Sequence, residues 1–321
     1  MTQNGSDSRL MLEVRGLNKK FGQVHAVNSL DFEVRRGEVF GFLGPNGAGK
    51  STTMRIVTCF IPPTSGTVRV DGMDTAEHDL AVRRKIGYLP ESTPLYSDMT
   101  VREYLAFVGE VRGLRGGALK SRMDNMFEVC ALTKMTGRQI GKLSKGYRQR
   151  VGLAQAMIHD PDLLILDEPM SGLDPNQIIE IRNLIKKIGS EKTVIYCSHI
   201  LSEVSATCDR ILIIKDGRIV ATGTPDELTS GHTSGSQYTL RVKGEREAVR
   251  SGIASVGGIS GVEVDDAGGG WCGVRVHAGA KEDIGESLFD CVVKNGWSLS
   301  ELRQDRTSLE DVFTQLTRSG Q

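Results

Sequence analysis

A glycine-rich loop followed by a lysine and a serine is the segment of this chain with the clearest chemistry. It reads Gly44-Pro45-Asn46-Gly47-Ala48-Gly49-Lys50-Ser51-Thr52 and has the spacing G-x-x-x-x-G-K-S of a phosphate-binding P-loop. The apolar run at 38–43 predicts a buried strand before it, and the pattern after it predicts a helix. The glycines let backbone N–H groups close around a phosphate, and the helix N-terminus adds partial positive charge. Lys50 can then reach the β- and γ-phosphates of a nucleotide, and Ser51 can hold Mg²⁺.

Two adjacent carboxylates end a second apolar run. Asp167 and Glu168 follow Leu163-Leu164-Ile165-Leu166, which predicts a strand buried on both faces. The pair therefore lies at the carboxyl tip of a strand, where open α/β sheets bind their ligands. Asp167 is suited to support Mg²⁺ through water, and Glu168 to polarise an attacking water as a general base. A solvated acidic turn is the alternative, and the P-loop upstream argues against it.

Three further polar positions are less specific on their own. Ser144 stands in the loop Leu143-Ser144-Lys145-Gly146-Tyr147, just before a helical pattern. Such a loop is an anion site, although N-capping by the serine explains it as well. Asp174 precedes Pro175 and fits an N-cap followed by proline at the first helical position. His199 follows an apolar run and by itself indicates only a capping or packed histidine.

The composition limits the classes of protein to consider. The chain has 321 residues, enough for a large domain and a small one, and its 40 basic residues equal its 40 acidic residues. The balance argues against a broad basic surface for direct nucleic-acid binding. Six scattered cysteines without a C-x-x-C predict free thiols in a reducing compartment. A polar N-terminus and the lack of any apolar run near 18 residues predict a cytoplasmic protein without its own transmembrane segment.

The elements expected around the motifs form one α/β domain over residues 1–228. Short β-type runs at 12–14 and 29–34 precede the P-loop, and helical patterns at about 92–160 indicate a helical insertion. Continuous apolar runs such as 193–197 suit a parallel sheet with both faces covered.

A glycine- and serine-rich linker at 229–236 leads to a second, smaller domain over residues 237–321. Its patterns follow the βαββαβ order of ferredoxin-like α+β folds. A closing helix is predicted at its end, with Thr307 as N-cap and Glu310 at the capping-box position. Because no catalytic constellation is evident there, we expect an accessory domain that stabilises a dimer or regulates it.

Four motifs and a histidine, in this set, resemble those of the ATP-binding subunit of an ABC transporter, from Leu12 to about Thr224. They correspond to Walker A at Gly44–Thr52, the signature at Leu143–Tyr147, Walker B at Leu163–Glu168, the D-loop Ser171-Gly172-Leu173-Asp174 and the switch histidine His199. The resemblance implies a P-loop ABC cassette with a helical subdomain that hydrolyses ATP with Mg²⁺. It also implies a head-to-tail homodimer in which each ATP lies between one P-loop and the partner's signature.

The resemblance also implies a role for each site residue. Glu168, His199 and Lys50 would be catalytic, with His199 sensing the γ-phosphate. ATP would contact Phe21, which matches the aromatic that stacks on adenine, and Gly44, Pro45, Asn46, Gly47, Ala48, Gly49, Lys50, Ser51 and Thr52. The partner's ATP would contact Ser144, Lys145, Gly146 and Tyr147, with Asp174 nearby. Mg²⁺ would be held by Ser51, Glu91 and Asp167.

The chain departs from the usual family pattern at two places. The common signature Leu-Ser-Gly-Gly-Gln here has Lys145 and Tyr147 at its third and fifth positions. This form, like the closing Leu309-Glu310-Asp311-Val312-Phe313, resembles ATPases of ABC-2 type exporters, including those named for gliding motility. Glu91 stands where the family usually has glutamine; its carboxylate is also a hard oxygen ligand, and a solvated loop residue is the alternative.

The resemblance therefore implies an ATPase on the inner face of the cell membrane that powers a separate permease, above all an ABC-2 type exporter. A soluble ABC ATPase acting on the ribosome or on DNA is one alternative; the single P-loop and the lack of an inserted coiled coil argue against it. An importer ATPase with a regulatory C-terminal domain is another, and the Lys-Gly-Tyr signature argues against that. The transported substrate is chosen by the membrane subunit and is not readable from this chain.

Overall fold

The computed structural model describes residues 10–231, 237–279, 284–305, 310 and 312–314. The chain divides into two compact units, one that extends to Pro225 and a second over residues 226–315. Each unit has its own hydrophobic core. No helix in the described part of the chain is long and apolar enough to cross a membrane. The six cysteines are free thiols, as predicted.

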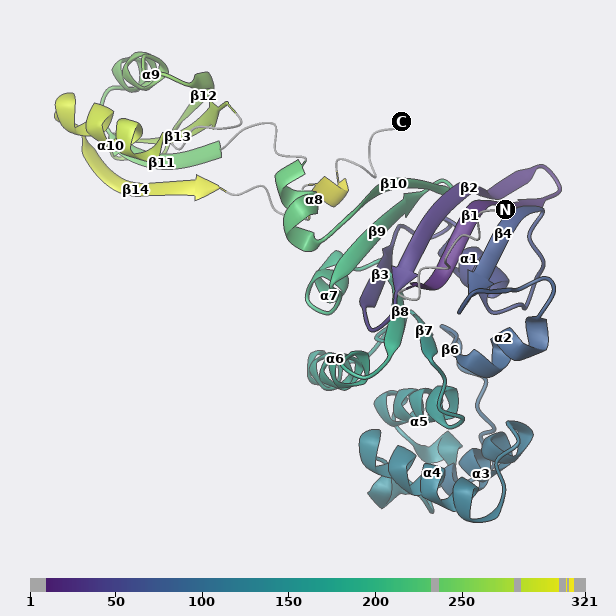
Figure 1. The fold of residues 1–321 in the computed structure, drawn as a ribbon. Coiled ribbons are helices and arrows are strands. Elements are labelled where there is room, and N and C mark those ends of the chain that lie inside the picture. The colour runs from purple at the N-terminus through teal and green to yellow at the C-terminus, as the bar shows by residue number, and fades with distance from the viewer. Residues whose placement is uncertain (1–9, 232–236, 280–283, 306–309, 311, 315–321) are drawn as a thin grey trace. The chain divides into compact units, whose positions relative to one another are not determined.

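The first unit opens with an antiparallel sheet in the order β2-β1-β4-β5. Its strands are β1 (Leu10–Phe21), β2 (Val24–Arg35), β4 (Ser65–Val70) and β5 (Met73–Asp74). The first two strands form a long hairpin (Figure 1). Along this hairpin the sequence predicted two short strands, at 12–14 and 29–34, because several register shifts interrupt the alternation of apolar and polar residues.

The central sheet has six strands in the order β10-β9-β3-β8-β7-β6. They are β3 (Val39–Leu43), β6 (Ile86–Leu89), β7 (Leu163–Asp167), β8 (Thr193–Ser198), β9 (Arg210–Lys215) and β10 (Arg218–Gly223). All of these strands except β10 run parallel to one another. Strand β10 pairs antiparallel with β9 and forms the predicted hairpin. Every residue of β3, β7 and β8 is buried. This confirms that the continuous apolar runs are strands covered on both faces.

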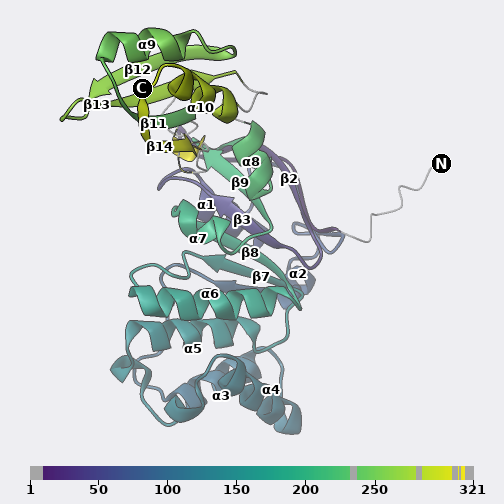
Figure 2. The same ribbon diagram turned by 90° about the vertical axis from the view of Figure 1, so that its left-hand side faces the viewer.

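Helices cover the central sheet and form a separate subdomain. Those beside the sheet are α1 (Lys50–Val57), α2 (Asp79–Lys85), α6 (Pro175–Gly189) and α7 (Leu201–Ser205). A further helix, α8 (Pro225–Gly231), begins at the last residue of the first unit and continues into the second. The predicted helical insertion contains α3 (Val101–Val111), α4 (Gly116–Val129) and α5 (Lys145–Met157), with short 3₁₀ turns at Thr133–Met135 and Ile140–Lys142. In Figure 2, α5 and α6 lie side by side, and Arg150 forms a 2.6 Å ion pair with Glu180 between them.

The second unit contains a four-stranded antiparallel sheet in the order β12-β13-β11-β14. Its elements are β11 (Gln237–Lys243), α9 (Arg246–Ala254), β12 (Ile259–Asp266), β13 (Trp271–Ala278), α10 (Gly285–Lys294) and β14 (Ser298–Asp305). One face of the sheet, with Tyr238, Leu240 and Val242, packs into the core together with both helices. The ferredoxin-like order is therefore confirmed. Most of the predicted closing helix, including Thr307, lies outside the described residues.

Candidate nucleotide-binding and catalytic site

Three neighbouring strands bring the predicted motifs to one edge of the central sheet. β8 pairs in parallel with β3 on one side and with β7 on the other. The P-loop follows β3, Asp167 and Glu168 end β7, and His199 follows β8. Because the carboxyl ends of parallel strands share an edge, residues from three distant parts of the chain meet there.

Two glycines give the P-loop its shape. Gly47 and Gly49 have φ angles of 81° and 104°, in the left-handed region that side chains disfavour. A Cβ at Gly49 would also lie 2.5 Å from the carbonyl oxygen of Ala26 on β2. The loop thus closes against the hairpin, and α1 begins at Lys50 with its free N–H groups facing the loop.

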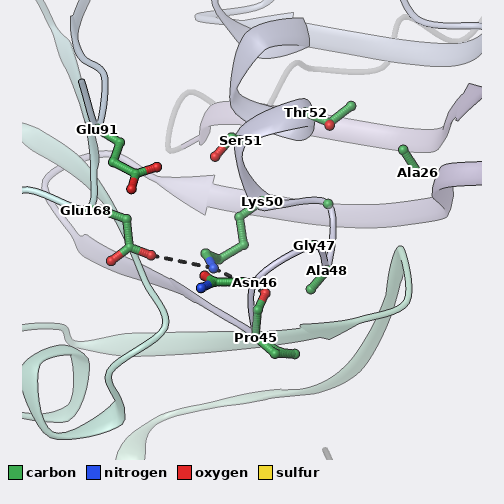
Figure 3. A pocket seen from close by; sticks show the side chains of 11 residues that line it. Ala26, Pro45, Asn46, Gly47, Ala48, Lys50, Ser51, Thr52, Glu91 and Glu168 are labelled. Carbon is green, nitrogen blue, oxygen red and sulfur yellow. Dashed lines mark hydrogen bonds and ion pairs between the residues drawn. The ribbon is translucent and has the colours of Figure 1, made fainter. Parts of the chain in front are cut away.

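The P-loop lines a cavity of about 370 Å³, within the range of small-molecule sites. The residues around it are Ala26, Pro45, Asn46, Gly47, Ala48, Gly49, Lys50, Ser51, Thr52, Glu91 and Glu168. Figure 3 shows Glu91 and Glu168 on the side opposite the loop, with Lys50 reaching toward Glu168. A cavity with backbone donors on one side and carboxylates on the other suits a phosphate that carries a metal ion.

The ammonium of Lys50 is buried and held by three oxygens. It donates to the carbonyl oxygens of Gly44 at 2.7 Å and Pro45 at 3.3 Å. It also lies 3.5 Å from Glu168 Oε1, the ion pair drawn in Figure 3. Both side chains of this pair are more than nine-tenths buried. A buried charge pair at the bottom of a polar cavity is an arrangement that an anionic ligand can reorganise.

The carboxylate of Glu168 has partners on both oxygens. Its Oε2 atom lies 2.9 Å from Nδ1 of His199 and accepts a hydrogen bond of 3.3 Å from the Ser198 hydroxyl. Its backbone has a left-handed φ of 50° and donates to the carbonyl of Cys197 on β8. The structure therefore brings together Lys50, Glu168 and His199, the three residues predicted to be catalytic.

Asp167 fits a hard metal ion. It is buried, and its Oδ1 atom has no hydrogen-bond partner among the described residues. Burial raises the pKa of its carboxyl, whereas a hydrogen bond with Ser51 lowers it. No three His, Cys, Asp or Glu side chains cluster as a metal site in the described ranges. Mg²⁺ requires few protein ligands because it keeps several waters, so Asp167, Ser51 and the cavity-lining Glu91 are a suitable set.

The signature loop lies against the D-loop. Ser144 is the N-cap of α5 and accepts from the N–H of Tyr147 at 3.4 Å; Asp174 is the N-cap of α6. A Cβ at Gly172 would lie 2.2 Å from Lys145 Nζ, and one at Gly146 would lie 2.8 Å from Cδ of the Gln177 side chain. None of the four predicted signature residues, Ser144, Lys145, Gly146 and Tyr147, lines the P-loop cavity of its own chain.

Known proteins are similar in sequence to this chain over nearly its whole length. The family described as ABC transporter matches residues 27–171. The linearmycin resistance ATP-binding protein LnrL of Bacillus subtilis is 33% identical over 308 residues, 96% of this chain and 98% of the relative. The chain belongs to the ABC transporter family. The bacitracin transport ATP-binding protein BcrA of Bacillus licheniformis is 32% identical over 312 residues, 97% of this chain and 98% of the relative.

Solved structures share the fold of the cassette. The ATP-binding subunit of an ABC transporter aligns with a TM-score of 0.63 and 29% identity, over 69% of this chain and 92% of that chain. A dimeric cassette, MJ0796 in a post-hydrolysis state bound to ADP and Pi, aligns with a TM-score of 0.61 and 27% identity, over 67% and 98%. This protein is thus an ATP-binding subunit of an ABC transporter, an ATPase with the P-loop cassette fold.

Two positions of this ABC ATPase, Phe21 and Ser198, lie outside the cavity lining. Phe21 lies at the end of the β1–β2 hairpin, 49% exposed, with Lys19 Nζ 5.1 Å from its ring centre. It does not line the cavity, so its role in binding adenine stays a prediction. Ser198, which contacts the Glu168 carboxylate, was not predicted. A hydroxyl directly before His199 at the end of a buried strand was the available signal.

Proposed function

We propose that this ABC ATPase powers a separate membrane permease and is the energy-supplying subunit of an ABC-2 type exporter of the gliding-motility-like branch. Support comes from its Leu-Ser-Lys-Gly-Tyr signature and from the names of its relatives. These name linearmycin resistance, bacitracin transport and, for a Ralstonia nicotianae protein 37% identical over 229 residues, Nod factor export. The chain aligns with 70% of that last relative.

The observation that carries the proposal is the convergence of Lys50, Glu168 and His199 beside the P-loop cavity. Glu168 takes a proton from the attacking water as general base. His199 contacts Oε2 of Glu168, whereas Lys50 contacts Oε1. His199 therefore orients the Glu168 carboxylate, and it also responds to the γ-phosphate. Lys50 moves from Glu168 to the phosphates when ATP binds, because the triphosphate carries more negative charge than one carboxylate.

Ser51, Asp167 and Glu91 would hold Mg²⁺ near the P-loop. Ser51 and Asp167 share a hydrogen bond, and the unpartnered Oδ1 atom of Asp167 supports the assignment. Glu91, which lines the cavity, would supply a further oxygen. The ion, when bound, neutralises phosphate charge that develops during hydrolysis.

A homodimer completes the site. The N-terminus of α5, with Ser144, Lys145, Gly146 and Tyr147, carries partial positive charge but does not line its own cavity. In the proposed dimer it faces the γ-phosphate held by the partner, with Asp174 beside it. Phe21 stacks on adenine at the mouth of the site, where its half-exposed ring leaves room for a base.

We further propose two domains: the cassette over residues 1–228 and an accessory domain over residues 237–321. The protein works on the inner face of the cell membrane, attached through its permease, and does not bind nucleic acid directly.

The test is copurification of the full chain with the polytopic membrane protein encoded beside it, followed by transport in inverted membrane vesicles. ATP-dependent uptake, which corresponds to export in the cell, is expected with the wild-type chain and not with Lys50→Ala. Failure to copurify, or transport in the opposite direction, would overturn the proposal.

A further inference from the structure

A second carboxylate lies behind the proposed catalytic base. Glu203, on α7, is buried, and its Oε2 atom accepts hydrogen bonds from the Tyr196 hydroxyl at 2.9 Å and from the Ser198 hydroxyl at 3.1 Å. In the described part of the chain, no Lys, Arg or His forms an ion pair with it. A buried carboxylate without a cation is costly, so its position next to the candidate active site points to a function.

Ser198 connects the two carboxylates. It is fully buried at the end of β8, and its oxygen accepts the N–H of Ile200 at 3.1 Å. Its single proton has two acceptors within reach: Glu168 Oε2 at 3.3 Å and Glu203 Oε2 at 3.1 Å. One hydroxyl donates one hydrogen bond at a time, so the two carboxylates compete for it.

Tyr196 is a second hydrogen-bond donor to Glu203, at 2.9 Å. Its side chain is fully buried, and burial together with the Glu203 carboxylate raises its pKa well above the ordinary value, so the phenol stays a donor. While Tyr196 donates to Glu203, that carboxylate has a partner without Ser198. The Ser198 hydroxyl is then available to Glu168.

We propose that Ser198, Glu203 and Tyr196 are positioning residues for ATP hydrolysis, in which Tyr196 occupies Glu203 so that the Ser198 hydroxyl orients the carboxylate of Glu168. None of the three lines the P-loop cavity. Their effect therefore falls on the chemical step and not on nucleotide binding. The inference rests on the proposed role of Glu168 as general base.

The test measures kcat, KM and MgATP binding for the full chain and its variants. Ser198→Ala removes the bond to Glu168, and Tyr196→Phe makes Ser198 turn to Glu203. Each is expected to lower kcat by roughly 10- to 100-fold, the value of one charge-assisted hydrogen bond. KM and the affinity for MgATP should change by less than about threefold, because these groups do not contact the nucleotide. Tyr238→Phe, which removes a buried hydroxyl in the second unit, is the matched control and should keep the wild-type kcat.

The decisive variant is the double substitution Tyr196→Phe with Glu203→Gln. A neutral amide attracts the Ser198 proton less than a carboxylate does, so the second change should recover at least about tenfold of the kcat lost in the first. If the three residues only support folding, a second buried substitution lowers kcat further. That result, or a wild-type kcat for Tyr196→Phe, overturns the inference. Thermal melting and MgATP binding verify that each variant is folded.

Glu168→Gln separates this inference from the function on which it rests. If Glu168→Gln hydrolyses ATP at the wild-type rate, the assignment of the base fails. If it is inactive while Ser198→Ala and Tyr196→Phe behave like the wild type, only the positioning network fails.

Discussion

Replacing Glu168 by glutamine should leave ATP trapped between two copies of the chain. Glutamine has the shape of glutamate and can still contact Ser198 and His199, which lie 3.3 and 2.9 Å from the carboxylate. It cannot take a proton from water. ATP binding should survive, because Lys50 keeps its bonds of 2.7 and 3.3 Å to the carbonyls of Gly44 and Pro45.

The size of the effect follows from the role of the carboxylate. Loss of a general base costs about 10² to 10⁴ in rate, which is about 2.7 to 5.5 kcal/mol in the activation free energy. An ABC ATPase slowed to this degree spends most of its time in the ATP-bound state. A dimer that forms on ATP and separates on hydrolysis should therefore accumulate.

Ser144→Arg tests whether the partner's signature closes that dimer. Ser144 caps α5 through the N–H of Tyr147, so the substitution also removes an N-cap worth about 1 kcal/mol. This is small beside the roughly 5 to 15 kcal/mol that stabilises a domain, and the variant should fold. Ser144→Thr keeps the cap and the hydroxyl and is the matched control.

Light scattering or analytical ultracentrifugation with MgATP reads out the result. We expect a dimer for Glu168→Gln and for Glu168→Gln with Ser144→Thr, and a monomer for Glu168→Gln with Ser144→Arg. A monomer in every case, with tight ATP binding intact, would contradict the ATP sandwich in solution. Reconstitution of the same variants with the permease then shows whether the dimer forms only on the membrane subunit.

Four further outcomes are expected. Lys50→Ala should abolish productive ATP binding in a titration with MgATP, because Lys50 is the only lysine among the described residues that line the P-loop cavity. Glu91→Gln should keep substantial ATPase activity, whereas Glu91→Ala should weaken the dependence on Mg²⁺ or the coupling to the permease, measured as ATPase rate against Mg²⁺ concentration. A chain that ends near Thr229 should stay folded and bind nucleotide in circular dichroism and binding assays, because each unit has its own core. Burial, followed by the neighbouring Arg112, lowers the pKa of His159 from 6.5 to about 4. Its contribution to stability is thus complete above pH 6.5 and is lost as pH falls toward 4, by about 2 kcal/mol at pH 5, and His159→Gln should remove this part of the urea-unfolding difference between pH 7 and pH 5.

Each of these has a clear contrary result. Unchanged affinity and hydrolysis in Lys50→Ala would refute the P-loop assignment for this chain. Wild-type behaviour of Glu91→Ala in both assays would make Glu91 a surface residue. An insoluble truncated chain would mean that the second unit completes the core of the first. An unchanged pH dependence in His159→Gln would mean that other groups cause the loss at low pH.

Local motifs made much of this protein predictable from its sequence. The P-loop could be predicted because all of its requirements lie within nine residues. Gly47 and Gly49 adopt left-handed backbone angles, and Lys50 begins a helix. Continuous apolar runs marked β7 and β8 as buried strands with polar groups at their tips. The order of these motifs indicated the family, and the βαββαβ order of the second unit was readable from its periodicities.

The tertiary structure alone decided which of these groups meet. The order of the central sheet places β3 beside β8, and this pairing depends on packing across long connections that no local pattern encodes. The full length of the β1–β2 hairpin was not predicted, because its register shifts break the alternation on which strand prediction depends. Nothing in the sequence around Glu203 indicated that its carboxylate is buried. Only the approach of α7 to β8 buries its carboxylate against Ser198 and Tyr196, behind the residue proposed to activate water.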